Sequence, residues 1–159
     1  MIKRAVIKRA VIVRPAVAAD VAGLAEMAST SYRAAFATIL DAGELARRDS
    51  ASFEPRFSAS LERLRVAEIA GRIVGFSLVT AHHLDMLFID PAAQGSGAGR
   101  ALLSEAVARG TCSLECFRAN HPARRFYERA GWVLTRGYSR RFAGQVHDFV
   151  YYERNANAG

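Results

Sequence analysis

One stretch of the sequence passes from a strand pattern through a glycine run directly into a helix pattern. Residues 84–89 are almost all apolar, which predicts a buried strand that stops at Asp90 and Pro91. Three glycines follow within residues 94–100, and apolar side chains then recur at helical spacing up to Gly110. A strand joined to a helix in this way belongs to folds in which helices pack on a sheet, so the unit predicts an α/β protein.

The rest of the chain surrounds this unit with further strands and helices. Strand patterns are expected over residues 11–13, 65–70, 73–80, 112–117, 132–138 and 146–153. Helix patterns are expected over residues 20–32, 44–47, 57–63 and 121–131. The strand–helix–strand–helix order of the second half implies parallel pairing with right-handed crossovers, and the flanking hairpins imply a mixed sheet.

Local signals set several boundaries. Asp20 is expected to cap the first helix, and turns are expected at Asp49 and Pro55. No linker interrupts the pattern, so residues 11–154 are expected to form a single domain. Residues 1–10 repeat a five-residue basic segment and are expected to form a mobile extension.

The composition is that of an ordinary globular domain. The chain has 159 residues, of which 51% are hydrophobic and 23% are charged. No stretch approaches the ~18 apolar residues of a membrane span, and Lys8, Arg9 and Arg14 interrupt any signal-peptide core. The protein is therefore expected to be cytoplasmic, with no membrane partner.

The net charge of +7 favours an anionic partner. No basic run is interleaved with aromatic residues, so we expect no nucleic-acid partner and keep nucleic-acid binding as a minor alternative. Cys112 and Cys116 are too few for a zinc site and too far apart in an extended segment to bridge each other. Both are expected to be small buried hydrophobic residues, and no metal is expected.

The glycine run has the features of a phosphate-binding loop. Gly95, Gly97 and Gly99 lie at the start of a helix, where unpaired amides and the positive end of the dipole attract anions, and Arg100 adds a charge. A nucleotide-binding P-loop would end in Gly-Lys-Ser or Gly-Lys-Thr, and a dinucleotide fingerprint would carry its third glycine at position 100. Neither pattern fits.

The run from Gln94 to Gly99, placed after a strand that ends in Asp-Pro, resembles the pyrophosphate loop of the GNAT superfamily of N-acetyltransferases. The resemblance implies that the loop amides hold the pyrophosphate of acetyl-CoA and that the preceding strand carries a bulge and pairs with the pantetheine arm. The cofactor-binding residues implied by the resemblance are Leu87, Phe88, Ile89, Gln94, Gly95, Ser96, Gly97, Ala98, Gly99, Arg100 and Asn120. It also implies an oxyanion-binding amide near Ile89.

The segment from Asn120 to Trp132 has two interpretations. As a plain helix, it would have Asn120 as its N-cap, Gly131 as its C-terminal glycine and Tyr127 in the core. It also resembles the asparagine–alanine–tyrosine–glycine element of the same superfamily at each named position. By that resemblance, Asn120 binds the cofactor near its thiol, and Tyr127 protonates the departing thiolate.

The general base has several candidates. Glu115 is preferred because it precedes Asn120 by five residues, as in the branch of the superfamily that acetylates protein N-termini. Asp85 on the preceding strand, His82 or His83, and water remain alternatives. No arrangement of nucleophile and base suggests an acyl-enzyme, so direct transfer in a ternary complex is expected.

The resemblance implies a mixed, twisted sheet of about six to seven strands, splayed in its middle and flanked by about four helices. The implied reaction transfers the acetyl group of acetyl-CoA to a primary amine of a small molecule or a protein N-terminus. A non-catalytic acyl-CoA sensor of the same fold is the alternative. Tyr32 and Phe36 are expected to line the acceptor site, and Glu44 or Asp148 could attract the amine. Members of the family often pair as dimers, so a homodimer stays open.

Overall fold

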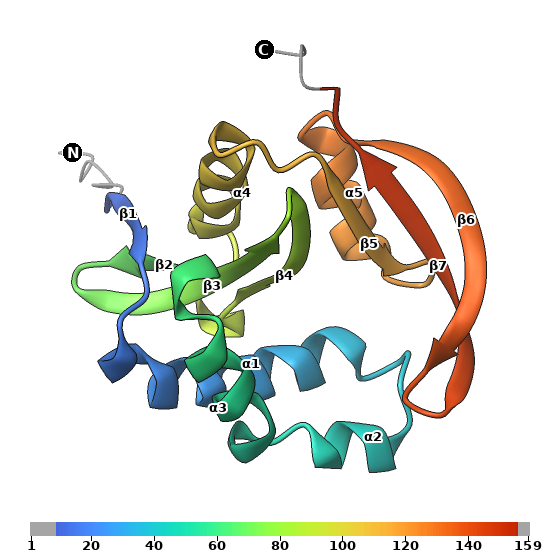
Figure 1. Ribbon diagram of the computed structural model, residues 1–159, viewed down its shortest axis with the longest axis horizontal. Helices are drawn as coiled ribbons and strands as arrows, with labels where there is room; N and C mark the ends of the chain where they lie inside the picture. Colours follow the sequence, from blue (N-terminus) through green and yellow to red (C-terminus); the bar gives the residue numbers. More distant parts are fainter. Residues whose placement is uncertain (1–8, 156–159) are drawn as a thin grey trace, which may run out of the picture.

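The computed structural model describes residues 9–155, which form one seven-stranded sheet with helices on both faces (Figure 1). The strands are β1 (Val11–Pro15), β2 (Leu64–Ile69), β3 (Arg72–Thr80), β4 (His83–Ile89), β5 (Ser113–Phe117), β6 (Val133–Phe142) and β7 (Gln145–Glu153). They lie in the order β1-β2-β3-β4-β5-β7-β6. All contacts between neighbours are antiparallel except the one between β4 and β5. The mixed sheet is therefore confirmed.

Five α-helices lie within residues 9–155, namely α1 (Val21–Phe36), α2 (Ala42–Arg47), α3 (Ser50–Ala59), α4 (Ala98–Ala108) and α5 (His121–Arg129). Figure 1 shows α1, α2 and α3 on one side of the sheet and α4 and α5 on the other. The apolar side chains of α1 and α3 pack with one face of the strands, and those of α4 and α5 pack with the other. No helix in this part of the chain has the length and apolar character that crossing a membrane requires.

The sheet splits between β4 and β5, as expected. These parallel strands pair only at His83↔Ser113 and Leu84↔Leu114 and then diverge. The parallel pairing expected throughout the second half stops there, because β7 inserts between β5 and β6 and pairs antiparallel with both.

The bulge expected near residues 87–89 lies earlier in β4. Leu78 and Val79 of β3 face Met86 and Leu84, so Asp85 is the extra residue between them. The local bend therefore falls next to the point where β4 separates from β5. The residues that follow, up to Ile89, keep a regular ladder with β3.

An aromatic side chain of α1 joins the two halves of the split sheet. The Phe36 ring lies 6.0 Å from Phe88 on β4 and 5.1 Å from Phe117 on β5, measured between ring centroids. Tyr32, one helical turn earlier, contacts both Phe36 and Phe88. Edge-to-face aromatic packing thus replaces the backbone ladder where β4 and β5 part.

Two expected boundary signals are wrong in detail. Asp20 immediately precedes α1, but it already has helical dihedral angles, and its carboxylate accepts a hydrogen bond from the Val17 amide and pairs with Arg14. Pro55 was expected to mark a turn but lies inside α3. Asp49 caps that helix, since its carboxylate accepts from the Ser52 amide at 3.0 Å.

The two cysteines differ from each other. Cys112 is exposed, so its expected burial is wrong, because it lies just before β5 begins. Cys116 lies partly buried within β5, and neither cysteine forms a disulfide. In the part of the chain that the structure describes, no cluster of histidine, cysteine, aspartate or glutamate could hold a metal ion. Residues 1–8 of the expected N-terminal extension lie outside the described residues.

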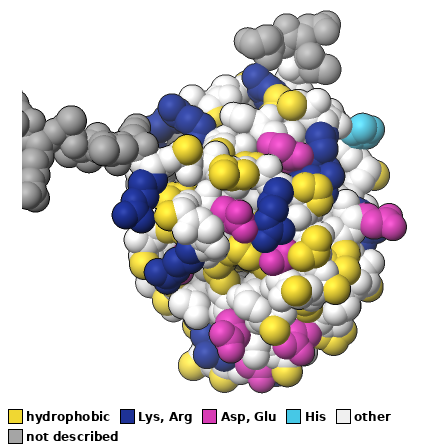
Figure 2. All heavy atoms as spheres, turned by 90° about the vertical axis from the view of Figure 1, so that its left-hand side faces the viewer, with side chains coloured by type: hydrophobic (Ala, Val, Ile, Leu, Met, Phe, Trp, Pro, Cys, Tyr) yellow, Lys and Arg dark blue, Asp and Glu magenta, His cyan; other side chains and the backbone are white. Residues whose placement is uncertain are grey.

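The face that carries β1 mixes both signs of charge (Figure 2). Arg14 on β1 pairs with Asp20 and with Glu68 on β2, each at 2.8 Å. Arg65 on β2 forms an ion pair with Glu105 on α4, with 3.4 Å between Nε and Oε1. Cations near β1 and β2 are therefore neutralised by neighbouring carboxylates.

Substituting two glycines should have opposite effects on stability. A Cβ atom at Gly75 would lie 2.5 Å from Ile89 Cδ1 and 2.9 Å from the backbone oxygen of Phe88, so Gly75→Ala should destabilise the fold by about 1–3 kcal/mol. Gly23 in α1 has open space around it, and Gly23→Ala should stabilise by up to about 1 kcal/mol through helix propensity. Urea unfolding of both variants measures the difference. Equal effects would contradict the close approach of β3 to β4.

Candidate active site

The glycine run forms a tight loop that presents free amides at the N-terminus of α4. Gly97 is the N-cap residue with φ +90°, a left-handed conformation that strains any residue with a side chain. The Ala98 amide is bonded to Ser96 Oγ at 3.3 Å. The amides of Gly99 and Arg100 have no partner among the turn and cap bonds of residues 9–155. The loop is thus open to an anion, as its sequence suggests.

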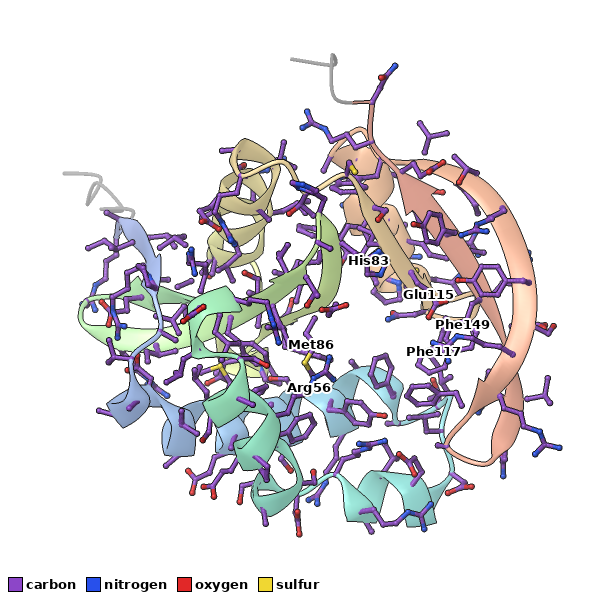
Figure 3. The ribbon with its side chains drawn as sticks, viewed as in Figure 1. Arg56, His83, Met86, Glu115, Phe117 and Phe149 are labelled. Atoms are coloured by element: carbon purple, nitrogen blue, oxygen red, sulfur yellow. The ribbon has the colours of Figure 1, made fainter. Side chains whose placement is uncertain are left out.

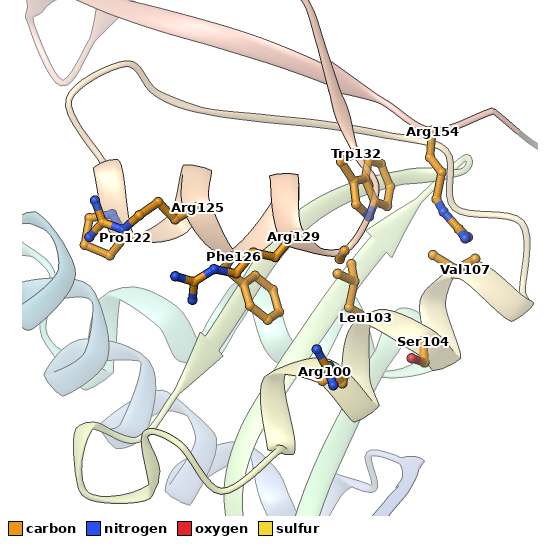
Figure 4. A pocket seen from close by; sticks show the side chains of 11 residues that line it. Arg100, Leu103, Ser104, Val107, Pro122, Arg125, Phe126, Arg129, Trp132 and Arg154 are labelled. Atoms are coloured by element: carbon orange, nitrogen blue, oxygen red, sulfur yellow. The ribbon is translucent and has the colours of Figure 1, made fainter. Parts of the chain in front are cut away.

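A cavity of about 510 Å³ continues from this loop between α4 and α5 (Figure 4). Arg100 and Ser104 line it from α4, and Arg125 and Arg129 line it from α5. At the N-terminal end of α4, Gly99 packs near the Phe126 ring, which lines the cavity from α5. The space between the two helices therefore has an apolar floor and a rim of guanidinium groups.

One buried polar atom beside this cavity has no partner. Trp132 lines the cavity and is 2% exposed, and its indole Nε1 has no hydrogen-bond partner in the described structure. A buried N–H without an acceptor is costly, so a polar ligand in the cavity could satisfy it. The arginines, the free loop amides and this indole all suit an anionic, polar ligand such as a nucleotide diphosphate.

The free edge of β4 adjoins the loop. From Met86 to Ile89, β4 pairs with β3 on one side and has no strand partner on the side of β5 within the described residues. Leu87, Phe88 and Ile89 are only partly buried there. An unpaired strand edge offers N–H and C=O groups to an extended ligand that contains amides.

Tyr127 lies deep between α5 and the second half of the sheet. It is 8% exposed and contacts the rings of Trp132 and Tyr152. Burial raises the pKa of its phenol, and the nearby Cys116 raises it further. Burial also raises the pKa of the Cys116 thiol, to about 12. At this place the structure keeps both a phenol and a thiol protonated at neutral pH.

Asn120 has the capping role that the sequence predicts. Its side-chain oxygen accepts a hydrogen bond from the Ala123 amide at 3.4 Å, which fixes the start of α5. Just after the C-terminal end of α5, Gly131 adopts a left-handed conformation with φ +90°, as is typical of a glycine that ends a helix. The Asn120 side chain is half-buried, and the residue lies just after the end of β5.

Glu115 lies on β5 within a polar cluster that faces α1 (Figure 3). Its carboxylate accepts hydrogen bonds from the Tyr138 hydroxyl and from Arg140, with which it forms an ion pair. Burial would raise the pKa of Glu115, but Arg140, Tyr138 and the nearby His83 outweigh burial and hold this pKa below its ordinary value. The carboxylate is therefore ionised at neutral pH and already well bonded.

The other candidate bases lie next to the split. His83 Nδ1 is 2.8 Å from Ser113 Oγ across the first paired position of β4 and β5, and its ring stacks on Tyr151 at 5.9 Å. The exposed Asp85 accepts a hydrogen bond from Thr80 at 2.5 Å. His82 is exposed and has a positive φ angle in the turn before β4.

The expected attraction of an amine by Glu44 is wrong. Glu44 is 4% exposed and forms ion pairs with Arg48 at 2.7 Å and Arg47 at 3.0 Å, so its charge is compensated. Burial alone would raise the pKa of Glu44, but the two arginines outweigh burial, so this pKa lies below its ordinary value. Asp148 is exposed and accepts from Ser139 at 2.5 Å.

Sequence reasoning missed most of the cavity between the helices. It named Arg100 but not Arg125, Arg129 or Trp132, which line the same space. A signal was present, because Arg125 and Arg129 are four residues apart and share one face of α5. The structure brings the predicted residues of β4 and of the glycine loop together. Asn120 is separate from them, because it follows the carboxyl end of β5.

Sequence comparison identifies the family. The model of the acetyltransferase (GNAT) domain matches residues 35–152. The chain belongs to this family. A curated relative, the peptidyl-lysine N-acetyltransferase YjaB of Escherichia coli (strain K12), is 36% identical over 63 residues, which are 39% of this chain and 43% of YjaB. The chain thus matches less than half the length of this relative.

Solved structures share the fold over nearly the whole chain. The solution structure of apo YjaB from Escherichia coli has a TM-score of 0.72 at 24% identity and covers 91% of this chain and 97% of that one. A GCN5-related N-acetyltransferase from Rhodopseudomonas palustris has a TM-score of 0.71 at 23% identity, with 94% and 99% covered. YncA from Salmonella typhimurium, solved with its cofactor acetyl-CoA, has a TM-score of 0.67 at 18% identity, with 94% and 95% covered.

Proposed function

We propose that this GNAT domain transfers the acetyl group of acetyl-CoA to a primary amine by direct attack in a ternary complex. The observation that carries the proposal is one continuous arrangement of three features. An open strand edge leads into a loop with free amides, and the loop leads into an arginine-rimmed cavity. A CoA thioester combines the matching groups, since it has amides in its arm, a diphosphate and a phosphorylated nucleoside.

The cofactor would lie along this arrangement. Leu87, Phe88 and Ile89 would pair with the pantetheine amides, and the amide near Ile89 would stabilise the oxyanion. The loop from Gln94 to Gly99 would hold the diphosphate, assisted by Arg100. Arg125 and Arg129 would hold the remaining phosphate, and Asn120 would lie near the thiol end.

Tyr127 would donate a proton to the leaving thiolate. A thiolate is destabilised by the same burial that raises the pKa of the neighbouring Cys116 to about 12, so it would need a proton as it forms. The Tyr127 phenol keeps its proton at neutral pH because burial raises its pKa too. A protonated donor beside a strongly basic leaving group suits general acid catalysis.

We propose Glu115 as the group that receives the proton of the amine. Its pKa lies below its ordinary value, so it is a carboxylate at neutral pH that would attract an ammonium group, take up its proton as the nitrogen attacks and release that proton to solvent water. It lies near His83, which belongs to the first pair of the β4–β5 ladder. The acceptor amine would be a small molecule or a protein group. The named activity of YjaB makes a lysine side chain one candidate.

A Tyr127→Phe variant distinguishes an enzyme from an acyl-CoA sensor. The ring remains and keeps its packing, so acetyl-CoA affinity should be unchanged, while kcat should fall by roughly 10²–10⁴-fold through loss of the proton donor. Thiol release from acetyl-CoA with a panel of amines measures kcat, and calorimetry measures affinity. Wild-type protein that binds acetyl-CoA but releases no thiol with any amine would favour the sensor.

The pH dependence of the reaction tests the role of Glu115. Because its pKa is lowered, Glu115 should be ionised between about pH 6 and 9, and kcat/KM should lack an acidic limb there. Arg140→Gln removes a group that lowers this pKa, so the pKa should rise and the acidic limb should move upward toward the measured range. Initial rates across this range measure both profiles.

A histidine base would behave differently. It would give wild-type protein an acidic limb within the measured range that survives in Glu115→Gln and disappears in His83→Gln. That result would reject Glu115 as the base. Glu115→Gln also breaks the ion pair with Arg140. Arg140→Gln breaks the same ion pair but keeps the Glu115 carboxylate, so it is the control for the loss of the pair.

A further inference from the structure

A second cavity, of about 570 Å³, lies at the end of β5, away from the cofactor cavity. Four parts of the chain line it, and one of them is the first half of α5, with His121 and Arg124. Ile39 comes from the segment after α1, Phe117 and Arg118 come from the end of β5, and Val146 comes from the start of β7. Val146 is 63% exposed, so the cavity opens to solvent past an apolar side chain.

The charged groups of this cavity are predominantly positive. Arg118 and Arg124 both line it, and neither forms an ion pair with a carboxylate within residues 9–155. Arg124 donates to the Tyr152 hydroxyl at 3.2 Å and to the Arg118 carbonyl at 3.0 Å, which are neutral acceptors. The single lining carboxylate, Asp148, accepts a hydrogen bond from Ser139.

The Arg118 side chain extends toward β6. It lies against the backbone of Gly137 on β6, where a Cβ atom would come within 2.3 Å of Nη2. The Arg118 amide also donates to the Asp148 carbonyl at 2.9 Å, which anchors the base of the side chain to β7. A guanidinium that lacks a carboxylate partner is suited to bind a carboxylate or phosphate.

The cavity is close to the proposed reaction centre. Arg118 directly follows β5 and is two residues after Cys116, which is about 7 Å at the rise of an extended strand. Cys116 in turn packs against the buried cluster that contains Tyr127. An amine placed near Tyr127 could therefore carry a second group that reaches Arg118 through a chain of several bonds.

We propose that this cavity binds an anionic group, a carboxylate or a phosphate, on the acceptor, so that the substrates are amines with a negative charge several bonds from the reacting nitrogen. The inference rests on the proposed acetyl transfer. Phe117, Ile39 and Val146 would contact the apolar chain between the two ends. Polycationic amines are disfavoured, because the cavity would place a second ammonium beside two guanidinium groups.

A matched pair of acceptors tests the charge requirement. ε-Aminocaproate and its amide differ at the far end and have similar amines, so their kcat/KM ratio with acetyl-CoA reports the anionic group alone. Wild-type protein should prefer the carboxylate by about tenfold or more, as expected for a charge-assisted hydrogen bond. Arg118→Gln should abolish this preference.

A peptide with lysine beside aspartate, compared with lysine beside asparagine, shows whether the anion comes from a free amino acid or from a protein.

A pair of surface variants supplies the control. Val146→Asp places a negative charge at the mouth of the cavity, and Val133→Asp places the same charge at the other end of the same hairpin. The two valines are 63% and 62% exposed, so both variants should fold. Val146→Asp should remove the preference for the carboxylate, and Val133→Asp should keep it.

Equal turnover of the acid and the amide by wild-type protein would overturn the proposal, as would a preference that survives in both Arg118→Gln and Val146→Asp. If no amine is acetylated although CoA binds, the proposed acetyl transfer fails, and the cavity is tested by binding alone. Calorimetric binding of N-acetyl-ε-aminocaproate that is lost in Val146→Asp would then support an anion site. Absence of binding to wild-type protein would reject it.

Discussion

The structure depends on a backbone ladder that stops after two residue pairs. β4 and β5 pair at His83↔Ser113 and Leu84↔Leu114, and within residues 9–155 their ladder has no pair beyond that point. Backbone groups left without partners are costly in a protein interior, so such an edge has to be solvated or filled. On the side of α1, the Phe36 ring fills the space between Phe88 and Phe117. On the other side, the opening leads to the cavity between α4 and α5.

Several features that reduce stability converge on this opening. The bulge at Asp85, the left-handed Gly97, the clustered arginines and the unpartnered indole of Trp132 would each be avoided in a sheet built for stability alone. They are consistent with one another if an anionic, amide-containing ligand occupies the opening. The membership of the chain in the acetyltransferase (GNAT) family agrees with a CoA thioester as that ligand.

The sequence predicts the fold where short-range chemistry decides it. The apolar strand before Asp90, the glycine loop and the Asn120 cap each depend on neighbouring residues, and all three are confirmed. The sequence does not predict features that depend on residues far apart in the chain. Nothing near Glu44 shows that two arginines will compensate its charge, and Asp20 binds Arg14 instead of capping α1. The ion pair between Glu115 and Arg140 joins β5 to β6 and requires the sheet order, which local patterns do not contain.

Hydrogen exchange of β4 with and without CoA tests the central claim most directly. If the free edge of β4 pairs with the pantetheine arm, CoA should slow amide exchange in residues 85–89 and in the loop over residues 94–100. Exchange in β2, which already has strand partners on both sides, should not change. Saturating CoA that leaves exchange in residues 85–89 and 94–100 unaltered would contradict the account.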